Sequence, residues 1–455
     1  MKTVYFIGIK GVGMTALAQV YQSRGYHVLG SDIETYFHTQ QVLDEQGIFY
    51  YQEFSPQNVP QEVDQVIVSS AYYSAAGLSD NVEVHECQRQ GFPLWTYSQA
   101  LGEVSRDFYT LAVTGSHGKT TTSAWLGYAL QELGNNPYVL VGSQVPDFGG
   151  NARIGNNRSV YCVLEADDYQ NHFLDLAPQA EIILNIDYDH PDFFPNEQTY
   201  IASYINFIQL LPAKRLVILC GDDPIIKEHI LTNNDLQTKY QLITYGYQKH
   251  NIMQLMEDNT IWYEQDKLGE LHSKLIGHHN RLNALAVASM LYWLGYEMED
   301  ILPALESFQG TKRRLEYYGE HSSGARVFDD YAHHPQEIQA TLSALREQYP
   351  HQRLVCLFQP HTFSRTKTFL EQFAQSFSQA DKVYLAPIYG SAREEQGTVS
   401  IQDLATAMKK FHSSVEVYSL DQPTDTICST FTKDTIFITL GAGNVWTVAQ
   451  KSINT

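Results

Sequence analysis

The stretch Gly115-Ser116-His117-Gly118-Lys119-Thr120-Thr121 has the residue types and the spacing of a phosphate-binding loop. It follows an apolar run that ends at Val113 and opens a helical pattern that continues to Leu133. The glycines let several backbone N–H groups point into one cavity at a helix N-terminus, where anions bind. Lys119 supplies a mobile charge for the outer phosphates of ATP, and the Thr120 hydroxyl is a magnesium ligand. A basic turn at a helix cap is the alternative, but the order of strand, loop, Gly-Lys-Thr and helix favours ATP binding.

A second glycine-rich turn joins an apolar strand (3–9) to an amphipathic helix (15–24) near the start of the chain. Such a βαβ unit holds a diphosphate against the helix N-terminus. The glycines follow GxxGxG, whereas the dinucleotide fingerprint is GxGxxG, so the spacing argues against NAD. The following strand (26–30) ends at Ser31 and Asp32, which we expect near the same ligand.

Acidic residues follow two strands of the predicted ATP-binding sheet. Glu165 comes directly after the strand 159–164, and an Asp-His-Pro-Asp loop that contains His190 follows the strand 181–186. Ligands of parallel sheets bind at the carboxyl ends of the strands, and magnesium prefers oxygen ligands. We therefore assign Glu165, with the Thr120 hydroxyl, to a magnesium site. A single histidine such as His190 is more often structural than a ligand.

Size and composition exclude several classes of protein. A chain of 455 residues suggests about three domains, and its net charge of −21 argues against a nucleic-acid surface. It contains no apolar run long enough to cross a bilayer. Five scattered cysteines form no CxxC pair, so a reducing, cytoplasmic setting is expected. Monomer and homodimer stay open.

These motifs resemble those of the Mur ligases, in the order of that family and over essentially the whole chain. The family carries the tight Gly-Ser-His-Gly-Lys-Thr-Thr loop, which lacks the general P-loop glycine at the position of Val113. It also carries the N-terminal turn, in which Lys10 replaces one glycine. We expect Lys10 either to be tolerated there or to face the diphosphate. The resemblance implies an α/β protein with two Rossmann-like domains around a P-loop domain whose sheet is mostly parallel. The expected ranges are 1–107 for the UDP-sugar domain, 108–313 for the ATP-binding domain and 314–455 for the C-terminal domain. We expect the segment from Leu101 to Phe108 to be the linker between the first two domains.

The resemblance implies a role for each matching residue. The UDP-sugar contacts would be Gly8, Gly11, Val12, Gly13, Met14, Ser31, Asp32, Ser70 and Ala71. The ATP contacts outside the loop would be Asn280, Asn283, Arg314 and Asp330. The metal ligands would be Thr120, Glu165 and His190, and the catalytic residues would be Lys119, His190, His333 and Arg365. Two of these assignments have ordinary alternatives, because Ser70 also suits a plain turn and Asn280 a helix cap.

His361 and Arg365 lie one helical turn apart after a predicted strand (354–358). A guanidinium can hold a carboxylate with two parallel hydrogen bonds, so we expect this pair to bind the amino-acid substrate, L-alanine. Some family members carry a second arginine where this chain has Thr362. The Pro-His-Thr-Phe form resembles a subgroup of Gram-positive lineages, and it leaves the second carboxylate contact open.

The implied activity is an ATP-dependent ligase of peptidoglycan synthesis, with two Mg²⁺ ions. It would join L-alanine to the lactyl carboxylate of UDP-N-acetylmuramate through an acyl phosphate. Small molecules would be its partners, with no nucleic acid and no membrane. Three alternatives are a recycling ligase that attaches a tripeptide to the same sugar nucleotide, an NAD-dependent oxidoreductase, and a non-catalytic nucleotide-binding regulator. The P-loop and the N-terminal glycine spacing argue against the oxidoreductase.

Overall fold

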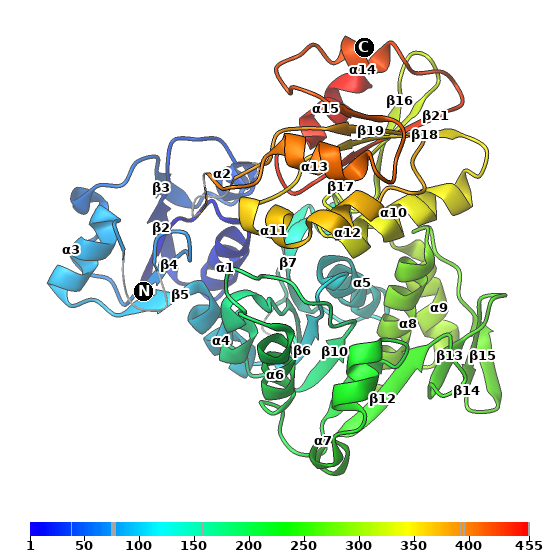
Figure 1. Ribbon diagram of the computed structural model, residues 1–455. Coiled ribbons are helices and arrows are strands. Elements are labelled where there is room, and N and C mark those ends of the chain that lie inside the picture. Colours follow the sequence, from blue (N-terminus) through cyan, green and yellow to red (C-terminus); the bar gives the residue numbers. More distant parts are fainter. Residues whose placement is uncertain (38, 74–78, 157, 391–393, 395, 454–455) are drawn as a thin grey trace. The chain divides into compact units, whose positions relative to one another are not determined.

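Three mostly parallel β-sheets follow one another along the chain, each covered by helices, which confirms the predicted α/β class (Figure 1). The computed structural model describes residues 1–37, 39–73, 79–156, 158–390, 394 and 396–453. Within these ranges no helix is long and apolar enough to cross a membrane. All five cysteines are buried and none forms a disulfide.

The first sheet has five parallel strands in the order β3-β2-β1-β4-β5, the arrangement of a Rossmann-like half. Its core strand β1 buries Tyr5 and Ile7 against one layer of apolar side chains that includes Val66 and Val68 of β4. The strands are β1 (Thr3–Ile7), β2 (His27–Ser31), β3 (Phe49–Tyr51), β4 (Gln65–Val68) and β5 (Leu94–Thr96). The helices are α1 (Val12–Ser23), α2 (Gln40–Glu45), α3 (Val82–Gln90) and α4 (Tyr97–Arg106).

The second sheet has ten strands in the order β15-β14-β13-β12-β11-β10-β6-β9-β7-β8. Its central strands, such as β11 (Leu216–Cys220), are buried on both faces and therefore read as continuous apolar runs. The others are β6 (Tyr109–Thr114), β7 (Tyr138–Val145), β8 (Gly150–Arg153), β9 (Tyr161–Glu165), β10 (Ala180–Ile183), β12 (Gln241–Gly246), β13 (Met253–Leu255), β14 (Thr260–Tyr263) and β15 (Asp266–Glu270).

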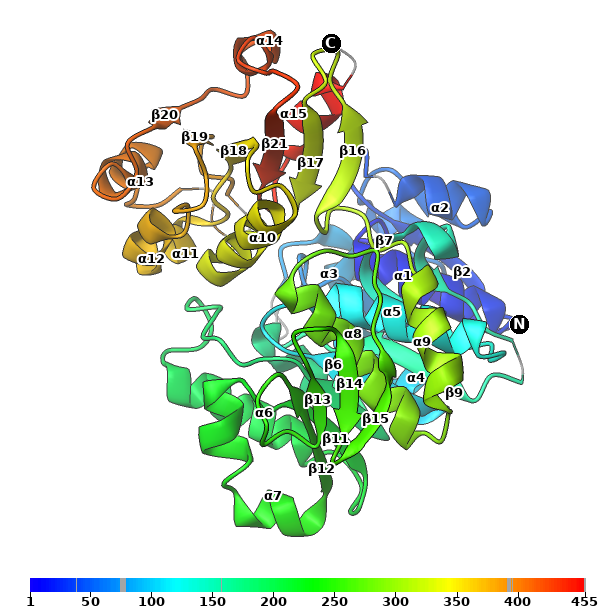
Figure 2. The same ribbon diagram turned by 90° about the vertical axis from the view of Figure 1, so that its right-hand side faces the viewer.

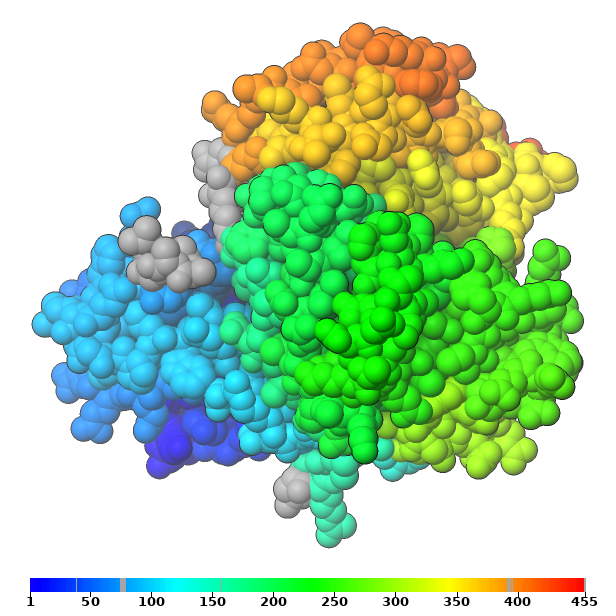
Figure 3. Space-filling model, turned by 60° about the horizontal axis from the view of Figure 1, so that its bottom comes forward, coloured from blue at the N-terminus to red at the C-terminus, as the bar shows by residue number. Residues whose placement is uncertain are grey.

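Helices cover both faces of this second sheet, because the chain leaves β6 in one direction along the sheet and later returns in the other. In Figure 2 the sheet lies between the helices of its two faces. In Figure 3 the side chains of this green part of the chain hide the strands. The helices are α5 (Lys119–Glu132), the 3-10 helix η3 (Tyr169–Asp175), α6 (Glu197–Ile208), α7 (Asn234–Lys239), α8 (His278–Trp293) and α9 (Met298–Ser307).

The third sheet has six strands in the order β16-β17-β21-β18-β19-β20, of which only β16 is antiparallel among those described. Residues of β18 alternate between two apolar layers, with Cys356 in one and Leu357 in the other. The strands are β16 (Glu316–Glu320), β17 (Arg326–Asp330), β18 (Arg353–Phe358), β19 (Lys382–Leu385), β20 (Val415–Val417) and β21 (Thr435–Leu440). The helices are α10 (Pro335–Gln348), α11 (Phe363–Thr368), α12 (Leu370–Gln375), α13 (Ile401–Met408), α14 (Asp425–Cys428) and α15 (Trp446–Ser452).

By their contacts the residues divide into two compact units. The first unit holds the first two sheets and comprises Met1–Asp187, Glu197–Ser273 and Leu282–Gln309. The second unit holds the third sheet and comprises Tyr188–Asn196, Lys274–Arg281 and Gly310–Thr455. The loop with His190 therefore belongs to the second unit, although it lies within the range expected for the ATP-binding domain.

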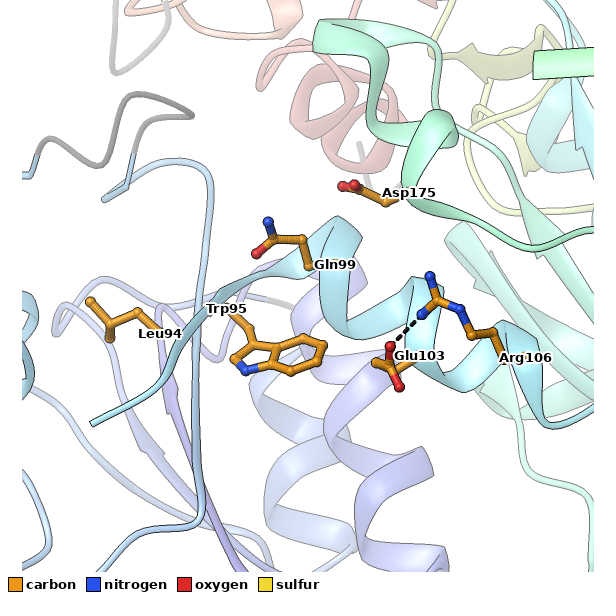
Figure 4. A pocket seen from close by; sticks show the side chains of 6 residues that line it. All are labelled: Leu94, Trp95, Gln99, Glu103, Arg106 and Asp175. Carbon is orange, nitrogen blue, oxygen red and sulfur yellow. Dashed lines mark hydrogen bonds and ion pairs between the residues drawn. The ribbon is translucent and has the colours of Figure 1, made fainter. Parts of the chain in front are cut away.

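The segment from Leu101 to Phe108, where the sequence suggests a linker between the first two domains, is mostly helix α4. This helix begins with a capping box at Thr96 and packs against η3 of the second sheet. Beside the contact between α4 and η3 lies a cavity of about 290 Å³. Figure 4 shows Gln99, Glu103 and Arg106 along α4, and Asp175 of η3 across the cavity from them. The junction is thus a packed helix.

We expect Gly102→Ala to destabilise this junction. A Cβ atom on Gly102 would lie 2.2 Å from the backbone oxygen of Asp175, so α4 and η3 would have to separate. Overpacking of this kind costs about 1–3 kcal/mol, more than the roughly 1 kcal/mol that alanine gains over glycine in a helix. Chemical denaturation followed by circular dichroism measures the loss.

Glu103→Ala on the same helix is the control, because it removes only the exposed ion pair with Arg106. An equal loss of stability in both variants would contradict the close packing of α4 on η3.

Candidate active site

The predicted phosphate-binding loop follows β6, which lies between β9 and β10 in the second sheet. The chain runs from β6 toward β7 on one side and returns to β10 on the other, so β6 ends at a point where the strand order reverses. Such points leave a crevice between the neighbouring loops, and ligands bind there. The topology therefore brings Lys119, Glu165 and Asn185 to one edge of the sheet.

Two glycines give this loop its shape. Gly115 and Gly118 have φ angles of +141° and +84°, which residues with a side chain rarely adopt. A Cβ atom on Gly118 would also lie 2.9 Å from the Asn283 side-chain oxygen. Asn283 therefore lies against the loop, as its predicted role in ATP binding requires.

Lys119 is held inside the loop by three acceptors. Its Nζ donates to the carbonyl oxygens of Gly115 (2.6 Å) and Ser116 (3.2 Å) and to Asp168 Oδ1 (2.7 Å). Burial alone would lower the pKa of Lys119, but the carboxylates of Asp168, Asp167 and Glu165 outweigh it and raise the pKa above its ordinary value. The lysine is therefore charged, and ATP phosphates would replace at least one of its present acceptors.

Asp168 follows Glu165 closely at a strand end, where the sequence alone allows either a role around the metal or a solvated position. Its side chain is fully buried, and it accepts hydrogen bonds from Lys119 and from the Tyr200 hydroxyl (2.5 Å). Its position in Glu-Ala-Asp-Asp at a strand end was the available signal in the sequence. Its partner Lys119 lies 49 residues away, so the pairing could not be predicted.

The residues assigned to magnesium in the first unit are adjacent. The Thr120 hydroxyl donates to Glu165 Oε1 at 2.9 Å, and Gly142 N donates to Glu165 Oε2 at 2.5 Å. Two neighbouring oxygen donors suit a hard divalent cation that takes its remaining ligands from water and phosphate. The pair therefore fits Mg²⁺.

The other loop residues connect it to the strand β10. Ser116 Oγ lies 2.9 Å from the Tyr200 hydroxyl and accepts from Asp187 N at 2.7 Å. His117 Nε2 lies 3.0 Å from Asp187 Oδ2, while Thr121 is buried on α5. These contacts hold the loop against the chain that follows β10.

The N-terminal turn is tied to the end of β2. The carbonyl oxygen of Ser31 accepts from Gly8 N (2.9 Å) and Ile9 N, and Asp32 Oδ2 accepts from Lys10 N at 2.7 Å. The Ser31 hydroxyl donates to the buried Glu83. Ser31 and Asp32 therefore shape the turn through contacts within the protein, and their contact with a sugar nucleotide stays a prediction.

Lys10, which replaces a family glycine, is fully buried. Its Nζ donates to the carbonyl oxygens of Ile33 (2.7 Å) and Thr35 (3.1 Å), so it braces the segment after β2. Of the two possibilities considered for it, tolerance or contact with a diphosphate, the geometry favours tolerance through this bracing role.

The remaining residues predicted near the sugar nucleotide differ in exposure. A Cβ atom on Gly13 would lie 2.6 Å from the Tyr97 ring, so this glycine lets α1 approach α4. Gly11 N donates to the Gly8 oxygen at 3.3 Å within the turn. Met14 is buried, Val12 is half-buried at the start of α1, Ser70 is half-buried and Ala71 is exposed.

In the second unit the two adjacent arginines have different surroundings. Arg313 donates to Asp329 Oδ2 (3.1 Å) and to the Gly441 oxygen (2.6 Å), which anchors it inside the third sheet. Both guanidinium groups lie over the Tyr331 ring, and Arg314 lies 3.8 Å from Glu337. The contact of Arg314 with a phosphate stays a prediction.

Asp330 ends β17 with both carboxylate oxygens bonded. Oδ1 accepts from Ala332 N at 3.0 Å, and Oδ2 accepts from the Thr341 hydroxyl at 2.8 Å. Burial raises the pKa of Asp330 to about 6, against the opposing effect of Arg314. Its predicted contact with the ATP ribose would have to share these oxygens.

His333, His361 and Arg365 lie together in the second unit. The rings of His333 and His361 are 5.8 Å apart, and His361 Nδ1 lies 3.3 Å from Arg365 Nη1. Burial lowers the pKa of His333 to about 3 and that of His361 to about 4, so both rings are neutral at pH 7. Arg365 is therefore the cation of this cluster, and its partner is Asp189.

His190 and Asn280 each make a hydrogen bond to a residue close by in the chain. His190 follows Asp189 with a φ angle of +57°, and its backbone N donates to Asp189 Oδ1 at 2.7 Å. The Asn280 amide donates to the Ile276 oxygen at 2.9 Å near the start of α8. Metal binding by His190 and adenine binding by Asn280 stay predictions.

The comparisons with known proteins now identify the class. Residues 3–109 match the model described as "Mur ligase family, catalytic domain", residues 113–291 match "Mur ligase middle domain", and residues 313–443 match "Mur ligase, glutamate ligase domain". The chain belongs to the Mur ligase family.

Individual relatives and solved structures carry names that are more specific than the family. A protein of Desulfitobacterium hafniense named UDP-N-acetylmuramate–L-alanine ligase is 36% identical over 99% of both chains. The crystal structure of UDP-N-acetylmuramate-alanine ligase MurC from Thermotoga maritima has a TM-score of 0.79 and 25% identity, covering 100% of this chain and 99% of that chain. A tripeptide ligase structure (UDP-N-acetylmuramate:L-alanyl-gamma-D-glutamyl-meso-diaminopimelate ligase) from Neisseria meningitides has a TM-score of 0.61 and 25% identity, covering 69% of this chain and 100% of that chain.

We expect Asp330→Asn to stabilise the fold at neutral pH. The pKa of about 6 lies above the ordinary 3.8, so the folded state holds the proton more tightly than the unfolded chain. Wild-type stability should therefore fall relative to the variant as the pH rises from about 4 to about 6. Above this window the variant gains up to about 3 kcal/mol, because one pKa unit corresponds to about 1.4 kcal/mol. Denaturant unfolding across this pH range measures the difference.

Asp403→Asn is the control with the opposite sign, because hydrogen bonds from Ser400 lower the pKa of that carboxyl. A difference between Asp330→Asn and wild type that does not change from pH 4 to pH 7 would contradict the raised pKa.

Proposed function

We propose that this chain is the ATP-dependent ligase that joins L-alanine to UDP-N-acetylmuramate in peptidoglycan synthesis. The observation that carries the proposal is the 36% identity to a ligase of that name over 99% of the chain. The phosphate-binding loop with its charged lysine, in the topology that such a loop requires, supports it independently.

The three sheets suit three tasks. We propose that residues 1–107 bind the UDP-sugar, residues 108–313 bind ATP and residues 314–455 bind the amino acid and part of the nucleotide. The N-terminal turn offers backbone N–H groups at the start of α1 for a diphosphate. The active assembly is a monomer or a homodimer.

Magnesium would supply charge neutralisation for the transferred phosphoryl group when it is bound. Thr120 and Glu165 would hold one ion, since their oxygens are 2.9 Å apart. His190 would be a ligand of a second ion. Lys119 adds a positive charge to the same loop, and the amides of the loop orient the phosphates.

The chemistry follows from the need to activate a carboxylate before an amine can attack it. The lactyl carboxylate oxygen attacks the γ-phosphorus of ATP, ADP leaves, and an acyl phosphate forms. The deprotonated amine of L-alanine then attacks the acyl carbon, and phosphate leaves to give the amide. His361 and Arg365 would hold the amino acid in place, because positioning accounts for much of the rate in such transfers.

Two histidines are candidates for accepting the proton of the amine. The low pKa of His333 makes it a weak base at pH 7. Its Nδ1 lies 3.0 Å from the backbone carbonyl oxygen of Tyr331, which can only accept a hydrogen bond. Nδ1 therefore carries the proton, and Nε2 can accept a hydrogen bond from the substrate. His190 is the other candidate.

Phosphate release with ATP, Mg²⁺ and UDP-N-acetylmuramate tests the proposal. We expect strong stimulation by L-alanine and much less by glycine, L-serine or the stem tripeptide. An apolar pocket discriminates one methyl group by only about 1–3 kcal/mol, so weak activity with glycine is expected.

Lys119→Ala is the inactive control, and we expect a loss of at least about a hundredfold because a charge at the transferred phosphoryl group is removed. Lys227→Ala changes an exposed lysine of the same unit and should leave the rate unchanged. Stimulation by the tripeptide alone would indicate the recycling reaction, and no stimulation by any amino compound would contradict the proposed function.

A further inference from the structure

Arg365 and Asp189 form a buried pair within the second unit. Arg365 Nε donates to Asp189 Oδ1 at 3.0 Å, and Nη2 donates to Oδ2 at 3.1 Å. The two side chains are 6% and 7% exposed. Nη2 also lies 2.9 Å from Oδ1, so Nε and Nη2 together contact the carboxylate from the side of the guanidinium.

A guanidinium has five N–H groups, and the contacts of Arg365 account for three of them. Two are directed at Asp189, and one on Nη1 is directed at His361 Nδ1, 3.3 Å away. Among the residues that the structure describes, one N–H on each terminal nitrogen has no further partner. Together they form the end of the guanidinium, which can bind a second carboxylate with two parallel hydrogen bonds.

Asp189 is itself held in place. Its Oδ1 accepts from the backbone N of His190 at 2.7 Å, so the carboxylate is fixed to its own loop as well as to Arg365. The nearby His333 and His361 are neutral, so Asp189 balances the only full positive charge of this cluster.

We infer that Asp189 is the positioning residue of the amino-acid site: it fixes Arg365 side-on, so that the end of the same guanidinium binds the α-carboxylate of the incoming amino acid. The inference rests on the proposed function. It also accounts for the single arginine of this site, since Thr362 stands where some family members carry a second one. One ordered guanidinium then needs no second cation to hold the carboxylate.

In the alternative arrangement, Asp189 occupies the place of the substrate carboxylate instead of orienting Arg365. The amino acid would then have to displace Asp189. Removal of Asp189 would then strengthen the binding of L-alanine, whereas a positioning role predicts that it weakens binding. The sign of the change in the KM for L-alanine decides between them.

The experiment measures initial rates of phosphate release against L-alanine concentration, at saturating ATP, Mg²⁺ and UDP-N-acetylmuramate. We expect Asp189→Ala to raise the KM for L-alanine at least about tenfold, because a buried arginine loses its carboxylate partner. The KM values for ATP and UDP-N-acetylmuramate should change less than about twofold. A purely structural loss would move all three KM values or the amount of folded enzyme instead.

Asp189→Asn keeps the shape and should weaken L-alanine binding less than Asp189→Ala, while Asp189→Glu, which keeps the carboxylate, should restore part of the affinity. Asp192→Ala removes an exposed carboxylate of the same loop and is the matched control. In an Arg365→Lys background, loss of Asp189 should add little, because the two residues act as one unit.

An unchanged or lowered KM for L-alanine in Asp189→Ala would overturn the inference. If that variant does not fold, the same outcomes apply to Asp189→Asn. Failure of the proposed function is distinguishable, because the wild-type enzyme would then show no stimulation by L-alanine at all.

Discussion

Cations paired with buried carboxylates are the interactions on which the candidate site residues of each unit depend. Lys119 donates to Asp168, whose side chain is fully buried, and Arg365 donates to the nearly buried Asp189. Burying an unpaired charge costs several kcal/mol, and pairing with good geometry recovers most of that cost. Each cation is therefore charged and oriented before an anionic substrate arrives. This matters in a chain whose net charge is −21, because anions must be captured by such local groups.

The sequence could predict the elements that carry these groups. Glycine-rich loops at strand ends, apolar runs and a Gly-Lys-Thr at the N-terminus of a helix are local signals. They predicted the α/β fold class and the loops at the edges of the sheets. The fold class and the order of motifs are confirmed. The boundaries of the three domains and the individual ligand contacts stay predictions.

The pairings could not be predicted, because they join residues far apart in the chain. Arg365 and Asp189 are separated by 176 positions and Lys119 and Asp168 by 49, and no periodicity relates them. The same limit applies to Lys10, whose side chain braces the segment after β2. The expected linker near Leu101 is a helix because its apolar positions pack on η3, a contact that only the tertiary structure provides.

We propose that the protein activates the lactyl carboxylate by transfer of the γ-phosphoryl group of ATP. UDP-N-acetylmuramate labelled with ¹⁸O in that carboxylate tests this phosphoryl transfer, with mass spectrometry of the products after a single turnover. An acyl phosphate leaves one labelled oxygen in the released phosphate and none in ADP. Label in AMP, or phosphate released without label, would contradict an acyl phosphate intermediate.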